Sequence, residues 1–140
     1  MNAGEFGVAL QLLDPGRDDF DASVDGLIGR LDTSDVHGCI DRVFEFFEAH
    51  PVADLGIPGS LVHFVEQFYP EYKARLLFSL RRTPSLSGVW MANRILNAEL
   101  GNADRARFVA SLEGIALNPA ADAGVRAFAR RFADLRQGKV

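Results

Sequence analysis

His63 and Glu66 lie three residues apart, so on a helix both side chains would share one turn and could bind a metal ion together. A metal site in a protein needs three or four ligands. The other candidate ligands are His37, His50 and Cys39, and no spacing unites them with this pair. We therefore interpret His63 and Glu66 as part of the polar face of a helix and predict no metal site.

Other patterns that could carry chemistry are incomplete. Residues 19–23 begin like a calcium-binding loop, but that loop requires glycine at Val24 and glutamate at Arg30. Residues 56–60, Gly-Ile-Pro-Gly-Ser, lack the lysine and the preceding strand of a phosphate-binding loop. Cys39 has no basic neighbour in the sequence, as expected for a buried, unreactive thiol. The sequence therefore predicts no catalytic residue, no cofactor and no enzyme activity.

The composition is that of an ordinary globular protein. The chain has 140 residues, of which 48% are hydrophobic and 24% charged, and this length suits a single domain spanning residues 1–140. One cysteine excludes an internal disulfide and favours a reducing compartment. The sequence shows neither a secretory signal nor a run of apolar residues long enough to span a bilayer. We expect a cytoplasmic protein that does not bind membranes.

Charge is unevenly distributed along the chain. Residues 1–60 contain 12 acidic and 3 basic side chains, a net charge of −9, whereas residues 61–140 contain 7 and 12, a net charge of +5. An acidic half repels nucleic acid and attracts basic protein surfaces.

Apolar residues recur at helical spacing, and no stretch alternates as a strand would. We predict an all-α protein of about six or seven helices, in which Thr33 or Ser34, Pro58 and Asn102 open helices. Residues 1–16 form either a short helix or an extended arm, because Asp14, Pro15 and Gly16 end any helix there. The predicted helices cover residues 18–32, 34–50, 58–69, 72–82, 86–97, 102–117 and 119–138.

A weak internal repeat suggests how the helices are arranged. Residues 73–80 recur as residues 105–112, and Pro84 recurs as Pro119, which indicates a period near 35 residues. That period is typical of stacked helical hairpins. We predict antiparallel hairpins in a HEAT-like stack, with an irregular helical bundle as the alternative.

Two predicted helices present acidic faces that could bind a partner protein. Solvation explains such faces equally well, but they could also steer a basic partner into contact. Two tyrosines beside a helix break are candidate anchors for the same interface, with packing in the core as the alternative. The candidate partner-binding residues are Asp18, Asp21, Asp25, Asp32, Asp41, Glu45, Glu48, Tyr69 and Tyr72.

The arginines of the second half could instead form a nucleic-acid surface. These residues are Arg81, Arg82, Arg126, Arg130, Arg131 and Arg136. Because no aromatic residues are interleaved among them as stacking platforms, we interpret them as solvated helix faces and predict no binding to nucleic acid.

Residues 64–97 carry a resemblance to a known family. Three segments and Tyr72 carry it: Phe-Val-Glu-Gln-Phe at 64–68, Ser-Leu-Arg-Arg-Thr-Pro at 79–84 and Trp-Met-Ala-Asn-Arg-Ile-Leu-Asn at 90–97. Together they resemble helical immunity proteins of bacterial polymorphic toxin systems, including contact-dependent growth inhibition. The resemblance implies a cytoplasmic protein that binds one cognate toxin C-terminal domain, often a nuclease with a basic cleft, as a 1:1 heterodimer. It also implies mostly structural roles for Asn93, Arg94 and Asn97.

The leading prediction is therefore an immunity protein that blocks the active site or an exosite of its toxin. A helical-repeat scaffold that binds another protein or a peptide is the first alternative, and a nucleic-acid-binding protein is the second.

Overall fold

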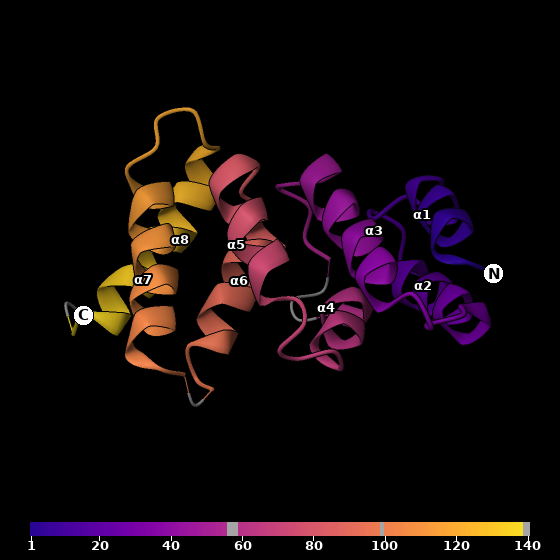
Figure 1. Ribbon diagram of the computed structural model, residues 1–140. Coiled ribbons are helices and arrows are strands. Elements are labelled where there is room, and N and C mark those ends of the chain that lie inside the picture. The colour runs from indigo at the N-terminus through magenta and orange to yellow at the C-terminus, as the bar shows by residue number, and fades with distance from the viewer. Residues whose placement is uncertain (56–58, 99, 139–140) are drawn as a thin grey trace.

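The structure is a computed structural model that describes residues 1–55, 59–98 and 100–138. Within these ranges the chain forms eight α-helices and no strand, so the all-α prediction is confirmed (Figure 1). The helices are α1 (Ala3–Gln11), α2 (Phe20–Arg30), α3 (Val36–Ala49), α4 (Gly59–Glu66), α5 (Lys73–Arg82), α6 (Leu86–Ile95), α7 (Asn102–Ala116) and α8 (Ala123–Arg136).

The first segment of the chain is the helix α1, not an extended arm. Asn2 and Glu5 form a capping box, in which the Asn2 side chain accepts from the Glu5 N–H and the Glu5 carboxylate accepts from the Asn2 N–H. Phe6 and Leu10, one turn apart, are fully buried and fix the helix against the rest of the protein. Because α1 forms, the described residues contain eight helices, whereas we predicted six or seven.

Several helix starts differ from the prediction by one or two residues. Asp35, and not Thr33 or Ser34, caps α3 by accepting from the Gly38 N–H at 3.0 Å. Asn102 is the first residue of α7 rather than its cap. The predicted start at Pro58 lies outside the described residues.

The helices pack in consecutive pairs from one end of the molecule to the other. Helices α1, α3, α5 and α7 each contact the next in that series, while α2 contacts α4 and α6 contacts α8. The N-terminal pair α1 and α2 and the C-terminal pair α7 and α8 lie at opposite ends, as do the two termini (Figure 1). The acidic and basic parts of the chain are therefore separated in space as well as in sequence.

Buried side chains from all eight helices form one hydrophobic core. Phenylalanines supply its largest members, and Phe44 and Phe47 meet edge to face with ring centroids 5.6 Å apart. None of the described helices is long and apolar enough to cross a membrane.

Trp90 lies between the core and the surface. Its ring stacks on Phe128 at a centroid distance of 6.4 Å and contacts Phe132 at 6.0 Å, but the residue is only partly buried. A fully buried tryptophan would cost about 3–5 kcal/mol on truncation to alanine. Because part of Trp90 stays in water, we expect Trp90→Ala to lower the free energy of unfolding by about 2 kcal/mol, measured by urea denaturation.

Candidate functional site

The first part of the candidate site is a group of exposed carboxylates on and beside α2, Asp18, Asp21, Asp25 and Asp32, here called the α2 acidic surface. Asp21 and Asp25 lie one helical turn apart on α2, and Asp18 lies in the turn that precedes this helix. Neither Asp18 nor Asp25 has a hydrogen bond or ion pair within the ranges that the structure describes. These two carboxylates are free to meet a partner.

The other two members of the α2 acidic surface hold local structure and stay exposed. Asp21 accepts a hydrogen bond from the Ser60 N–H at 3.3 Å, which connects α2 to the first turn of α4. Asp32 accepts from the Ser34 N–H at 3.0 Å, and this bond lowers the pKa of the Asp32 carboxyl. Both side chains are exposed and contribute to the acidic character of this surface.

The acidic residues of α3 are instead paired with arginines of the same chain. Arg75, on α5, donates from Nη1 and Nη2 to the Glu48 carboxylate at 2.8 and 3.2 Å and from Nε to Asp41 at 3.2 Å. Its guanidinium also lies over the rings of Phe44 and Phe78. Asp41 and Glu48 therefore join α3 to α5, and the Asp41 side chain is still 52% exposed, so the partner-binding role of both residues stays a prediction.

Glu45 is paired in the same way. Both of its carboxylate oxygens accept from Arg42 Nη1 at 2.9 Å. The Arg42 chain crosses α1 at Gly7, where a Cβ atom would lie only 2.5 Å from Arg42 Cδ. The ion pair compensates the charge of Glu45, but its side chain is still 46% exposed, so its partner-binding role stays a prediction.

The two tyrosines have different environments. Tyr69 is 43% exposed and lies in T-shaped contact with Tyr72, with ring centroids 6.0 Å apart. Tyr72 is 3% exposed, and burial, with Glu66 and Tyr69 nearby, raises its pKa to about 12. Tyr69 could contribute to an interface, whereas Tyr72 belongs to the core and offers a partner almost no area.

The pairing of Glu48 with Arg75 predicts how stability changes in acid. Burial raises the pKa of the Glu48 carboxyl, but the hydrogen bonds from Arg75 and Ser79 and the nearby positive charges outweigh burial, so the pKa is lowered overall. A carboxyl whose pKa is lower in the folded state stabilises the protein above its unfolded pKa. We expect the free energy of unfolding to fall as the pH drops from about 4.3, the ordinary glutamate value, through the lower folded pKa. Urea denaturation over this range measures the fall, and Glu48→Gln should reduce it.

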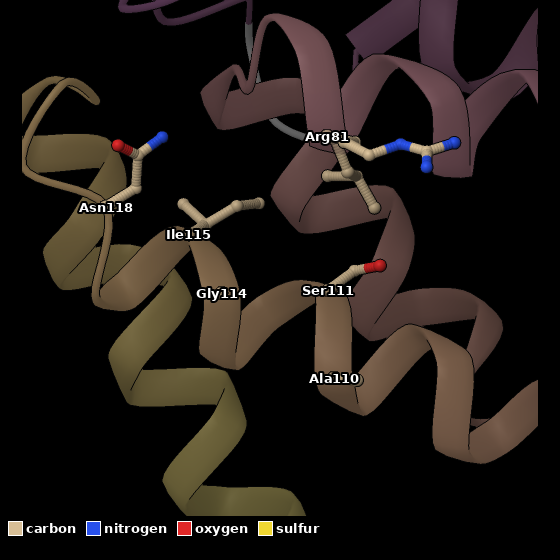
Figure 2. Close-up of a pocket in the computed structure, with 7 residues that line it drawn as sticks. Arg81, Ala110, Ser111, Gly114, Ile115 and Asn118 are labelled. Carbon is tan, nitrogen blue, oxygen red and sulfur yellow. The ribbon is translucent and has the colours of Figure 1, made fainter.

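The arginines at the other end of the molecule are dispersed and partly engaged. Arg130 pairs with Asp134 at 3.5 Å, the Arg131 guanidinium lies over the Phe132 ring, and Arg136 bonds to Asn93 and Asn97. Arg81 is exposed, without a partner among the described residues, and borders a hollow of about 400 Å³ between α5 and α7. Figure 2 shows this hollow, with Ser111 and Ile115 on its α7 side. The absence of nucleic-acid binding by these arginines stays a prediction.

The candidate metal pair is also engaged within the chain. His63 Nδ1 lies 3.8 Å from Glu66 Oε1, but Glu66 already accepts two hydrogen bonds from Arg94, at 2.6 and 3.0 Å. Among the described residues no three His, Cys, Asp or Glu side chains gather closely enough to hold a metal ion. Cys39 is fully buried, and burial raises the pKa of its thiol, as expected for an unreactive cysteine.

The three motif residues of α6 and its C-terminus make contacts that no local pattern predicts. Arg94 clamps Glu66 of α4, while Asn93 and Asn97 accept hydrogen bonds from Arg136 of α8. The mostly structural roles that the resemblance implies for these residues stay a prediction. They join helices 28 to 43 residues apart in the sequence, so spacing alone does not reveal them.

Comparison with known proteins gives no family assignment. No protein-family model, no curated protein and no solved structure matches this chain.

Proposed function

We propose that this protein is a non-enzymatic immunity protein that binds the C-terminal domain of a cognate secreted toxin as a 1:1 complex in the cytoplasm and blocks its active site or an exosite. The α2 acidic surface is the proposed contact, with Tyr69 as a possible aromatic addition to it. A toxin with a basic cleft, such as a nuclease, is the target that this charge favours.

One observation supports this proposal above the others. The carboxylates of α3 are compensated by Arg42 and Arg75, yet Asp18 and Asp25 remain exposed and unpaired within the described ranges. Exposed charges contribute little to folding stability, but complementary charges accelerate the encounter of two proteins and select the partner. A cationic surface is the complement of this region.

The proposal includes a HEAT-like stack of antiparallel hairpins. The series of contacts from α1 through α3 and α5 to α7, with α2 on α4 and α6 on α8, supports it. Such stacks present extended surfaces on which charges from consecutive units can line up against a partner.

Growth rescue combined with co-purification tests the proposal. The probe is the toxin domain encoded beside this gene, expressed with and without this protein. The expected result is restored growth and a stable 1:1 complex by size-exclusion chromatography with light scattering. Toxicity that persists, together with no complex, would contradict the proposal.

Growth rescue and a separate measurement of retention on nucleic acid distinguish the two alternatives. A helical-repeat scaffold would give neither rescue nor a neighbouring toxin gene. A nucleic-acid-binding protein would be retained on DNA or RNA at low salt and released as salt rises.

A further inference from the structure

Besides the hollow between α5 and α7, the protein has a concave site away from the α2 acidic surface. It lies between the C-terminal end of α4, the segment before α5 and the end of α6. Its volume is about 370 Å³, and we call it the α4–α6 hollow. Two tyrosines, an arginine and an asparagine supply most of its polar groups. The lining residues are Glu66, Tyr69, Tyr72, Arg94, Ile95, Asn97 and Ala98.

Arg94 presents an unused hydrogen-bonding edge at this hollow. Its Nε and Nη2 atoms donate to the two oxygens of Glu66, which occupies one side of the planar guanidinium. The opposite edge, with the Nη1 protons and the second Nη2 proton, has no acceptor among the described residues. Its side chain is 38% exposed, so a ligand can reach this edge. Two parallel N–H groups on a planar fork match the two oxygens of a carboxylate.

Asn97 is oriented as a second donor. Its Oδ1 accepts from Arg136 Nη2 at 3.0 Å, which leaves the amide N–H groups without a partner in the part of the chain described. Arg136 is itself held by neutral oxygens of Asn93 and Asn97 and has no carboxylate partner among these residues. A positive charge therefore stands directly behind Asn97.

The tyrosines complete a set of donors. The hydroxyl groups of Tyr69 and Tyr72 have no hydrogen-bond partner among the described residues, and the raised pKa of Tyr72 keeps its hydroxyl protonated. Glu66 is the one carboxylate among the described residues that line the hollow, and it is already bonded to Arg94. The unused polar groups of the hollow are thus predominantly donors.

We propose that the α4–α6 hollow binds a single carboxylate group, which the free edge of Arg94 and the amide of Asn97 hold. The carboxylate belongs either to a small organic acid or to the C-terminus of a polypeptide. A dianionic phosphate fits less well, because Glu66 already neutralises Arg94, and Arg136 is then the one of these two guanidinium groups without a carboxylate partner among the described residues. This inference does not depend on the proposed function.

The test is an NMR titration of the ¹⁵N-labelled protein with sodium acetate, compared with sodium chloride at equal ionic strength. We expect acetate to shift the side-chain signals of Arg94 and Asn97 in a saturable manner that chloride does not reproduce. A blocked trialanine peptide with a free C-terminal carboxylate, compared with its amide, identifies the source of the carboxylate. Binding of acetate and of the free-acid peptide alike indicates a general carboxylate site, and binding of the free-acid peptide alone indicates a polypeptide C-terminus.

Asn97→Asp separates ligand binding from folding. The aspartate keeps an oxygen for Arg136 but replaces the donor amide with a negative charge, so we expect affinity for the carboxylate to fall at least about tenfold. The midpoint of unfolding should not fall, because Arg136 gains a charged partner. The matched control is Asn118→Asp. Asn118 lies on the α7–α8 connection, where its Oδ1 accepts a backbone N–H. This variant should bind the carboxylate as tightly as the wild type does. Failure of both acetate and the free-acid peptide to bind, equal binding of the amidated peptide, or unchanged binding by Asn97→Asp would each overturn the proposal.

Discussion

Reversing the two unpaired carboxylates, in the variant Asp18→Lys with Asp25→Lys, should weaken binding to the toxin domain on the order of thirtyfold, about 2 kcal/mol. An exposed charge pair contributes up to about 1 kcal/mol, and reversal replaces attraction by repulsion at both positions. Because neither side chain bonds within the described chain, the helical circular dichroism spectrum and the thermal midpoint should stay close to those of the wild type. Isothermal titration calorimetry gives the affinity.

Glu71→Lys with Glu113→Lys is the control, since it changes the net charge by the same amount outside the α2 acidic surface. Because Glu71 lies 3.5 Å from His37 and Glu113 accepts from Gln137 at 2.6 Å, the thermal midpoint of this control is measured beside its affinity. This control should lose much less affinity than the α2 variant. Equal losses in the two variants would show that net charge, and not the α2 acidic surface, determines binding.

Arg75→Ala should destabilise the fold by about 3 kcal/mol. The Arg75 and Glu48 side chains are only 18% and 21% exposed, so truncation leaves a half-buried carboxylate without its partner. It also removes the stacking of the guanidinium on Phe44 and Phe78 between α3 and α5. Urea denaturation at neutral pH measures the loss.

Arg81→Ala is the control on the same helix, because Arg81 is exposed and has no partner among the described residues. Its free energy of unfolding should be close to that of the wild type. Replacing both members of the pair, Arg75→Met with Glu48→Leu, should recover most of the stability, because apolar side chains replace the partly buried ions. If Arg75→Ala is as stable as Arg81→Ala, the ion pair does not hold α3 against α5.

The helices were predictable because their signals are local. Apolar spacing, prolines and capping residues lie within a few positions of the structure that they determine, and α8 illustrates this with Val125, Ala129 and Phe132 on its buried side. Its start was misplaced: α8 begins at Ala123 after the cap Asp122, and not at Pro119 as predicted. The capping box of Asn2 and Glu5 is an equally local signal and would have decided the helical state of α1.

The candidate site was harder to predict because exposure depends on distant partners. Asp41 and Asp25 are both acidic residues on the polar faces of predicted helices, and nothing near them in the sequence distinguishes them. Asp41 is compensated by an arginine 34 residues later, whereas Asp25 has no partner in the described chain. Only the packing of α5 against α3 makes that difference.

This difference also changes how mutations should be grouped. From the sequence alone, we would predict that reversing the charges of Asp21, Asp25, Glu45 and Glu48 together weakens binding and leaves the fold intact. The structure shows that Glu48 holds α5 and that Glu45 compensates Arg42, so reversing these two would alter stability as well. Asp18 and Asp25 are the positions at which binding can be tested without that effect.

The dependence of the association rate on ionic strength tests the central claim most directly, measured by stopped-flow mixing of this protein with the toxin domain. If the α2 acidic surface steers a cationic partner, the rate constant of the wild type should fall steeply as salt rises, and the variant Asp18→Lys with Asp25→Lys should associate more slowly with a much flatter dependence. Identical rates and identical salt dependence in the two proteins would contradict the account.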